Sequence, residues 1–344
     1  MFSILIIGVL YLFRVRVMSS STGEVAREMD LRVQGKLGPH EARCVQRNVL
    51  LETLEAELPR GTIRYSSKLV SIDEDGGDDV KILHLADGST LRAKVLIGCD
   101  GINSVVAKWL GLAKLSDSGR TTTRGHATYP DGHGFEHKMM QFSGQGFRAG
   151  MIPCNETDVF WFFTWSPPPS RPTGNGKEDD DQSPAAMKPF VLAKLRSVNA
   201  PAKVLDVVER TEMSDVLVAP LRYRPPLSLL LASISRGNVC VAGDALHPTT
   251  PDLAQGACVA LEDAVVLARC LGDAIVSADE IEEALRRYAG IRRWRSAQVI
   301  AASYVMGLLL QSDRAVVNFA RDRLLSRLLA KVHVMMREYD CGTL

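Results

Sequence analysis

The sequence predicts an α/β protein in which one largely parallel sheet is built from both halves of the chain, with a β-rich domain inserted between them. Residues 95–98 (VLIG) and 238–242 (NVCVA) are nearly continuous apolar stretches, as expected of strands that are covered on both faces. Each stretch is followed closely by an aspartate beside a glycine. The residues between them differ in texture, with short strands, glycine-rich turns and one low-complexity segment. A single sheet that the chain visits twice explains this order.

The domain boundaries follow from these changes of texture. Residues 1–112 and 235–290 are expected to form the α/β domain, residues 113–234 the inserted domain, and residues 291–344 a set of C-terminal helices. Residues 166–184 (SPPPSRPTGNGKEDDDQSP) are too rich in Pro, Gly and Asp to pack, so we expect a mobile surface loop there.

Apolar spacing and turn residues predict the elements within these domains. In chain order they are a helix at 45–58, a strand at 62–72, a hairpin at 80–93 that turns at Asp87-Gly88, strands at 138–142 and 159–165, a helix from near Pro251 to Gly272, and amphipathic helix from about 278 to 338. The aromatic run at residues 160–165 (FWFFTW) is expected to pack in the core of the inserted domain, with pocket lining as the alternative.

Composition argues against several classes of protein. The 41 Lys+Arg and 40 Asp+Glu leave a net charge of +1, so there is no basic surplus to bind nucleic acid. The seven cysteines are scattered and never spaced C-x-x-C, which indicates reduced, mostly buried thiols in an intracellular, cytoplasmic protein, and no zinc site. His133 and His137 are four residues apart, but Gly132 and Gly134 argue against a helix, so no metal pair is expected.

The apolar residues 2–13 (FSILIIGVLYLF) are too few to span a bilayer, which needs about 20 residues. Arg14 and Arg16 follow this stretch, whereas a signal peptide carries its positive charge before it. We therefore expect no transmembrane span and interpret the stretch as a buried strand or an unnatural start. A signal peptide or an anchor is the alternative.

The strongest functional motif is Gly243-Asp244, followed by residues 245–248 (ALHP), 251–256 (PDLAQG) and 262–264 (EDA). A buried strand delivers Asp244 at its carboxyl end, where open α/β sheets bind ligands. The helix expected near Pro251 has free N–H donors at its first turn, and these would stabilise an anionic or electron-accepting ring. Asp244 can accept hydrogen bonds from the hydroxyls of a sugar or polyol chain. The alternative is an aspartate in an ordinary turn.

Two further candidates lie earlier in the chain. Asp100 and Gly101 follow the first buried strand, so Asp100 is expected to be a second carboxylate on the same sheet edge as Asp244. Arg47 is a guanidinium on a helix that is otherwise apolar on one side. The alternatives are a plain turn at Asp100-Gly101 and a solvated charge at Arg47.

These motifs resemble those of the flavin-dependent aromatic-type (class A) monooxygenases, the family of para-hydroxybenzoate hydroxylase and zeaxanthin epoxidase, and are most similar to its small plant members. The resemblance runs from about His40 to the C-terminus. It implies a Rossmann-like FAD/NAD(P)-binding domain and an inserted substrate domain. It also implies that Asp100 and Gly101 serve the flavin and the nicotinamide pyrophosphate, and that Gly243 and Asp244 hold the ribityl chain.

The same resemblance implies that Pro251, Gln255 and Gly256 lie along the isoalloxazine, and that Arg47 of the R-x-x-L-L helix contacts the cofactor. The implied cofactors are FAD and NAD(P)H, and the implied partners are O2 and a small hydrophobic or aromatic substrate. The implied reaction is hydroxylation or epoxidation through a flavin hydroperoxide. Because the cofactor performs the difficult chemistry, no catalytic side chain is named, and His247 is not expected to act as a base.

Two departures from the family pattern matter. Members begin with a strand and a G-x-G-x-x-G turn, but here residues 4–8 (ILIIG) supply only the strand and first glycine, and Leu10 and Phe13 occupy the next glycine positions. We therefore expect the phosphate-binding unit to be missing from a chain truncated at its N-terminus, which would weaken FAD binding by roughly a thousandfold. Ala254 replaces the first glycine of G-Q-G, at a cost of about 1 kcal/mol. The alternative function is a flavin-free remnant that is inactive or only binds a ligand, and a reductase is a third.

Overall fold

The computed structural model describes residues 10–12, 14–18, 25–30, 33–35, 38–40, 42–74, 80–144, 146–167, 183–272, 278–314, 316–317, 336 and 339–342. Residues 4–8, which carry the expected first strand and glycine, and residues 168–182 of the expected loop lie outside this part of the chain. The chain folds into two compact units. The first unit comprises residues 1–62, 119–221 and 308–326, and the second comprises residues 63–118, 222–307 and 327–344.

The second unit contains the sheet that the sequence predicts from both halves of the chain. β10 (Leu96–Gly98) pairs in parallel with β17 (Val239–Val241), and β16 (Ser235–Arg236) adds an antiparallel edge. A separate antiparallel sheet has the order β7-β8-β9, with bounds Leu69–Glu74, Lys81–Leu85 and Thr90–Ala93. The helices of this unit are α2 (Val105–Trp109), α5 (Pro226–Leu231), α6 (Gly256–Gly272) and most of α7 (Ala278–Gln311), with the 3-10 turns η2 (Gly243–Ala245) and η3 (Pro251–Leu253).

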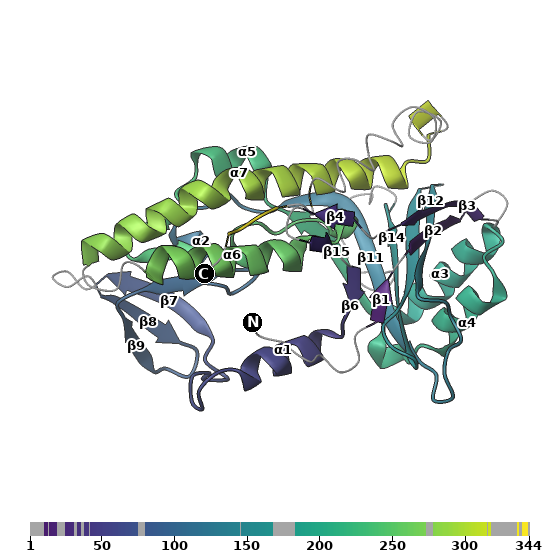
Figure 1. The fold of residues 1–344 in the computed structure, drawn as a ribbon, viewed down its shortest axis with the longest axis horizontal. Helices are drawn as coiled ribbons and strands as arrows, with labels where there is room; N and C mark the ends of the chain where they lie inside the picture. The colour runs from purple at the N-terminus through teal and green to yellow at the C-terminus, as the bar shows by residue number, and fades with distance from the viewer. Residues whose placement is uncertain are drawn as a thin grey trace, which may run out of the picture. The chain divides into compact units, whose positions relative to one another are not determined.

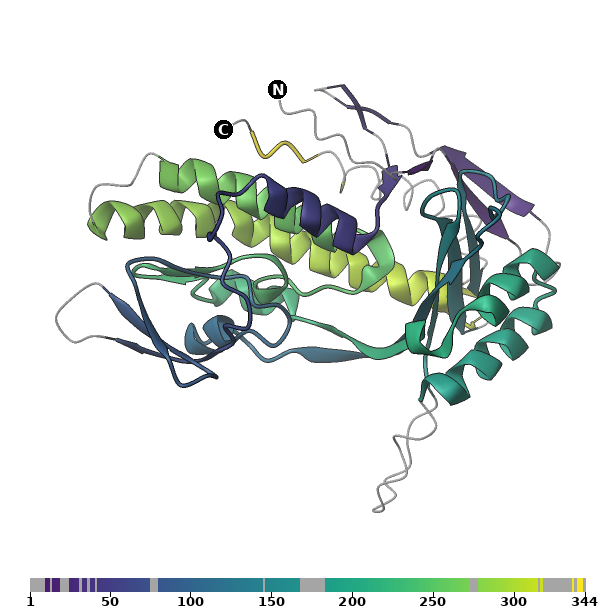
Figure 2. The same cartoon turned by 90° about the horizontal axis from the view of Figure 1, so that it is seen from below.

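Apolar burial holds this unit together. Val239, Cys240 and Val241 of β17 are all fully buried, as the unbroken apolar run predicts. α2 packs directly on β10 because Gly98 has no side chain: a Cβ there would lie 2.5 Å from the Cβ of Val106. α6 and α7 lie side by side, in green and lime in Figure 2.

The first unit is built on a seven-stranded sheet with two helices on one face (Figure 1). The strand order is β15-β11-β14-β13-β12-β2-β3, with bounds Leu217–Tyr223, Ser116–Thr128, Asp158–Trp165, Phe147–Pro153, Lys138–Gly144, Arg14–Met18 and Val25–Asp30. The other elements are β1 (Leu10–Leu12) paired with β6 (Ala42–Cys44), β4 (Val33–Gly35) paired with β5 (Gly38–His40), α1 (Arg47–Ala56), α3 (Pro184–Ser197), α4 (Ala202–Arg210) and the 3-10 turn η1 (Met213–Asp215).

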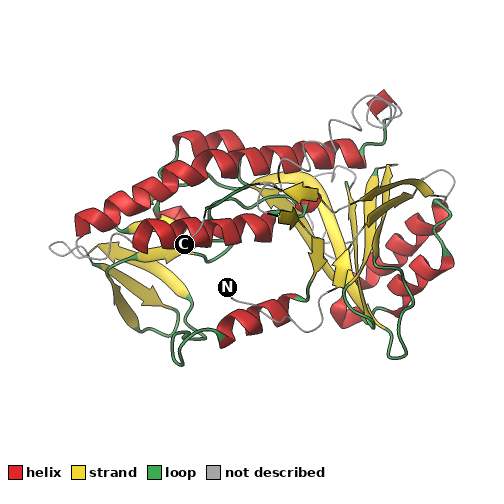
Figure 3. Ribbon diagram, in the orientation of Figure 1, coloured by secondary structure: helices red, strands yellow, loops and turns green. Residues whose placement is uncertain are grey.

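Trp161 and Phe163 of the aromatic run in β14 lie in this unit's core, which confirms the expectation for these two residues, whereas Phe160, Phe162 and Trp165 are half-buried. Trp161 and Phe163 are fully buried among apolar side chains of α3 and α4, the two helices drawn in red beside the yellow sheet in Figure 3. The indole N–H of Trp161 is satisfied by the hydroxyl oxygen of Thr211 at 2.8 Å. The ring nitrogens of His133 are likewise used inside its own turn: one lies 2.5 Å from the carbonyl oxygen of Asn155, and the other accepts the N–H of Phe135 at 2.9 Å.

Several expectations differ from the structure. The strand expected at 62–72 begins only at Leu69, and α3 and α4 were not expected in a β-rich domain. Residues 1–62 group with the inserted domain and not with the α/β domain, because β2 pairs in parallel with β12 of the seven-stranded sheet. Among the described helices, none combines the length and the apolarity that crossing a bilayer requires.

Candidate cofactor site

The two predicted strand-end motifs lie at one edge of one sheet in the second unit. The parallel register pairs Leu96 with Val239 and Gly98 with Val241. Asp100 and Gly243 therefore each follow the last paired residue of their strand by two positions. Parallel strands end at the same edge, which is where α/β sheets bind ligands. The placement that the sequence argument requires is thus present.

Asp100 is committed to its own helix. One oxygen of its carboxylate accepts the hydroxyl of Ser104 at 2.5 Å, and the other accepts the N–H of Val105 at 2.7 Å. Ser104 caps α2 in turn, because its hydroxyl oxygen accepts the N–H of Ala107 at 2.8 Å. Both carboxylate oxygens of Asp100 therefore hold the first turn of α2. The backbone of Gly101, at φ 79°, makes the bend that lets Asp100 reach it.

Asp244 is exposed, as Asp100 is, but its carboxylate makes no hydrogen bond or ion pair to any other described residue. It lies in η2, and Gly243 before it has φ 58°, a conformation that favours glycine. The turn therefore presents an unused acceptor to solvent at the end of β17.

Asp263 on α6 fixes this turn by accepting a backbone N–H group of the turn. One oxygen of its fully buried carboxylate accepts the N–H of Gly243 at 2.7 Å and lies 2.6 Å from Nε2 of His247. The other oxygen accepts Nε–H of Arg292 on α7 at 2.6 Å. Glu262 extends the network, because it accepts hydrogen bonds from Arg292 at 2.8 Å and from Arg295 at 2.7 Å.

The charge of Asp263 is compensated inside the protein. Burial alone would raise the pKa of this carboxyl group. The hydrogen bond and charge of His247, the charge of Arg292 and the N–H of Gly243 together outweigh burial and hold the pKa below its ordinary value. Asp263 is therefore ionised at neutral pH and holds the turn as an anion.

Arg224 fixes the same turn by donating to backbone carbonyl groups of the turn. Its buried guanidinium donates to the carbonyl oxygens of Leu246 at 3.0 Å and Ala245 at 2.9 Å, and it also reaches the carbonyl of Ala113. Its backbone N–H donates to the carbonyl of Pro248 at 3.1 Å. Burial lowers the pKa of Arg224 to about 10, so it remains a cation at neutral pH.

The segment after the turn bends before its helix begins. η3 covers Pro251–Leu253, Ala254 follows in the left-handed conformation with φ 53° and ψ 35°, and α6 begins at Gly256. The expectation of a helix starting near Pro251 is therefore wrong, because the left-handed residue ends the first turn. The left-handed conformation also explains why glycine suits position 254, since an L-residue there is strained by about 1 kcal/mol.

The start of α6 carries free donors. The N–H of Val259 bonds back to the carbonyl of Gln255, the residue before this helix, at 2.9 Å. The N–H groups of Gly256 and Ala257 precede it and have no acceptor among the described residues. A helix start with free N–H groups attracts electron-rich atoms.

The remaining predicted residues have contrasting settings. Pro251 is exposed, whereas Gln255 is buried. Arg47 is the first residue of α1 in the first unit, and its side chain is exposed. Their contacts with a cofactor stay predictions.

Sequence reasoning included Asp263 only as part of the E-D-A run at the end of the motif, with no role of its own, and it did not single out Arg224. Asp263 follows the turn by twenty residues and reads as an ordinary helix acid, although a full aliphatic surrounding (ALEDAVVL) marks it as buried. Arg224 precedes two prolines after a strand, and nothing in its local sequence indicates that three carbonyl groups converge on it.

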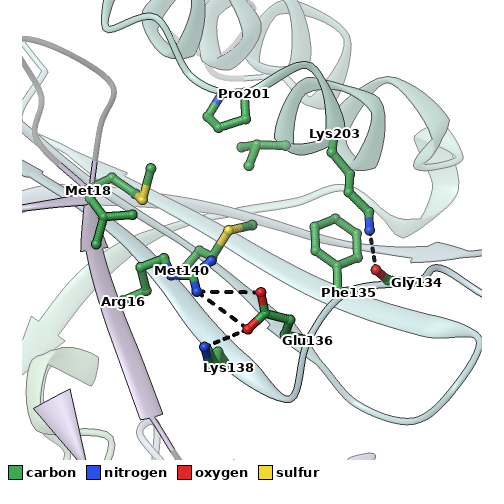
Figure 4. A pocket seen from close by; sticks show the side chains of 11 residues that line it. Arg16, Met18, Gly134, Phe135, Glu136, Lys138, Met140, Pro201 and Lys203 are labelled. Atoms are coloured by element: carbon green, nitrogen blue, oxygen red, sulfur yellow. Dashed lines mark hydrogen bonds and ion pairs between the residues drawn. The ribbon is translucent and has the colours of Figure 1, made fainter. Parts of the chain in front are cut away.

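The first unit holds a separate pocket of about 250 Å³ between β2, β12 and α4 (Figure 4). Met18, Phe135 and Met140 give it an apolar lining, and at one side Glu136 pairs with Arg16 at 3.4 Å and with Lys138 at 2.5 Å. The surface that lines the pocket is nevertheless mainly apolar. None of the strand-end residues lines it.

Asp244 and the start of α6 fit a cofactor with hydroxyl groups and an electron-accepting ring. Asp244 offers an acceptor for hydroxyls, and Gly256 and Ala257 offer donors that would favour a ring gaining negative charge. The ribityl chain and the isoalloxazine of a flavin have these two properties.

Comparisons with known proteins agree with this chemistry. A family model described as FAD binding domain matches residues 20–303. The chain is 43% identical over 319 residues to Monooxygenase 2 of Arabidopsis thaliana, covering 89% of this chain and 75% of that protein. It is 37% identical over 314 residues to Monooxygenase 1 of the same plant, covering 88% and 77%.

A solved structure shares the fold. HpxO of Klebsiella pneumoniae, complexed with FAD and uric acid, matches with a TM-score of 0.76 at 20% identity, covering 98% of this chain and 83% of that chain. At this identity the likeness shows the fold alone, and that fold is the Rossmann-like α/β architecture expected from the sequence.

Proposed function

Because this chain belongs to the family of the FAD binding domain and is an FAD-dependent monooxygenase, we propose that it uses NADH or NADPH and O2 to hydroxylate or epoxidise a small hydrophobic or aromatic substrate. The presence of uric acid in the structure of HpxO supports a substrate of the size of a small ring system. The proposal rests on one observation above all: the carboxylate of Asp244 is uncommitted, and its turn packs on α6, the helix that opens with free N–H groups.

When bound, FAD supplies redox chemistry with NAD(P)H and O2 that protein side chains cannot supply. The residues of this chain bind and orient it. We assign the ribityl hydroxyls to Asp244 and the electron-rich edge of the ring to the N–H groups of Gly256 and Ala257. Arg47 is assigned to a phosphate by its charge, and Gly101 to backbone contact, because the carboxylate of Asp100 holds α2.

The purified full chain tests this function directly. We expect a yellow protein whose flavin absorbance bleaches on anaerobic addition of NADPH or NADH and returns with air. Small aromatic compounds that accelerate NAD(P)H consumption are then screened for an added oxygen atom by mass spectrometry with ¹⁸O2. A colourless protein whose unfolding midpoint does not rise with added FAD would show instead a flavin-free chain.

A further inference from the structure

Two thiols of the first unit lie in contact although 110 residues separate them. Sγ of Cys44, at the end of β6, is 3.3 Å from Sγ of Cys154, directly after β13. Cys154 is buried and Cys44 is partly exposed, so solvent reaches the edge of the pair. Both are free thiols.

The surrounding backbone holds these two segments together independently of the sulfur atoms. The N–H of Cys154 donates to the carbonyl of Asp158 at 2.8 Å, which fixes it in the turn between β13 and β14. Gln46, two residues after Cys44, donates to the carboxylate of Asp158 at 3.1 Å. Cys44 also packs in an apolar cluster with Val15 and Ile152. The approach of the two thiols is therefore imposed by the fold.

The two thiols also differ in pKa. A hydrogen bond from Cys44 lowers the pKa of Cys154, against the opposing effect of burial, and the same contact raises the pKa of Cys44. The thiolate is the reactive form of cysteine, and the hydrogen bond favours it at Cys154.

We propose that Cys44 and Cys154 form a dithiol modification site that a peroxide converts reversibly to a disulfide. With hydrogen peroxide, the O–O bond breaks, one sulfur gains an oxygen as sulfenic acid and a first water leaves. The second sulfur then attacks the first, the S–S bond forms, and the oxygen leaves with the second thiol proton as another water. Two electrons pass from the sulfur atoms to the peroxide. The sulfurs need to approach by roughly 1.2 Å, because a disulfide bond is about 2.0 Å long.

The bond would lock the chain just before α1. Cys44 precedes Arg47, the first residue of that helix, by three positions. A disulfide here closes a long loop that includes residues 63–118 of the second unit, and cross-linking a long loop removes more entropy from the unfolded state than cross-linking a short one. We expect oxidation to stabilise this unit and to fix the segment that leads into α1.

Peptide mapping of the full chain tests the site. The protein is titrated with hydrogen peroxide until Cys99, an exposed thiol of the second unit, is modified, and then alkylated and digested without reduction. We expect a linked pair of peptides containing Cys44 and Cys154, two hydrogens lighter than their sum, before Cys99 reacts. Dithiothreitol should separate them. If Cys99 is modified while Cys44 and Cys154 remain alkylated or carry separate oxides, the proposal is overturned.

Matched variants separate the link from general oxidation. Oxidised wild type and a Cys99→Ser variant should both show a rise of roughly 5 °C in melting temperature that dithiothreitol reverses. Cys44→Ser and Cys154→Ser should each lack the linked peptide and the rise. A rise that persists in Cys154→Ser would assign the effect to other thiols and contradict the site. The mapping of the wild type does not depend on how these variants fold.

Discussion

Asp100 and Asp244 follow neighbouring parallel strands, yet their carboxylates are used in opposite ways. Both oxygens of the Asp100 carboxylate accept hydrogen bonds from the first turn of α2. The turn that contains Asp244 is held by other groups, and its carboxylate remains available. The two sites differ in which side chains hold the turn that follows the strand. At Asp244, separate residues, Asp263 and Arg224, hold the turn, so the carboxylate itself has no structural role among the described residues.

The largest effect on stability is expected when the anion that holds the turn of Asp244, Asp263, is removed. In Asp263→Asn the buried Arg292 loses a charged partner at 2.6 Å, so we expect the free energy of unfolding to fall by about 3–5 kcal/mol in urea titrations. FAD affinity should fall as well, because asparagine keeps only one acceptor oxygen and cannot serve both the N–H of Gly243 and the Nε–H of Arg292. Glu282→Gln, which breaks an exposed ion pair with Arg286 on α7, is the control and should change little.

Acid should reveal the same residue. Because the folded protein lowers the pKa of Asp263, the unfolded state binds its proton first as pH falls. The stabilisation from this carboxylate is thus complete above about pH 4 and is lost progressively below it. Asp263→Asn should lose less stability between pH 5 and pH 3 than wild type. Parallel pH curves for the two proteins would contradict this role.

A smaller effect is expected from the cation on the opposite side of the turn. Lysine in Arg224→Lys cannot serve three separate carbonyl groups, so we expect a loss of about 2 kcal/mol in unfolding free energy. Arg222→Lys, an exposed arginine two residues earlier, is the matched control and should behave as wild type. Equal behaviour of the two variants would show that Arg224 does not hold the turn.

The two aspartates themselves give the sharpest contrast. Asp100→Ala should lower the stability of the flavin-free protein by about 1 kcal/mol, because α2 loses its carboxylate cap, and leave the Kd for FAD nearly unchanged. Asp244→Ala should do the reverse, with about a tenfold weaker Kd and an unchanged unfolding midpoint. Flavin fluorescence titration and thermal unfolding measure both. An exchange of these outcomes would refute the comparison.

The smallest effect concerns the bend before α6. Ala254→Gly relieves a left-handed alanine, so we expect a gain of up to about 1 kcal/mol in thermal or urea unfolding. Ala257→Gly, in the first turn of α6 where the backbone is helical, should be destabilising by a similar amount. The same sign for both variants would mean that strain at residue 254 is negligible.

The sequence was sufficient for the sheet and for the position of both aspartates, because unbroken apolar strands and their terminal Asp-Gly pairs are local signals. It was not sufficient for their different use. Ser104 could have indicated the cap that engages Asp100, since serine before an apolar helix is a typical N-cap. The partners of the Gly243 turn come from residues 224 and 263, and no local pattern reports such distant contacts.

The missed helices of the first unit have a different cause. α3 carries a serine N-cap at Ser183, a proline in its first turn and buried Met187, Val191 and Leu195 at helical spacing. These signals were present, but the low-complexity segment before them drew the interpretation toward loop and strand. The bend at Ala254 could not be predicted, because alanine favours helix and rarely adopts positive φ.

The network behind the Gly243 turn also sets how the protein responds to ionic strength. Asp263 and Glu262 face Arg292 and Arg295, and His247 also contacts Asp263, so these groups meet within a nearly sealed interior. Dissolved ions screen exposed charges over about 8 Å in physiological salt but hardly reach groups that water does not contact. The scaffold of the turn is therefore insensitive to salt, and a salt-dependent change in flavin retention would have to arise at exposed charges.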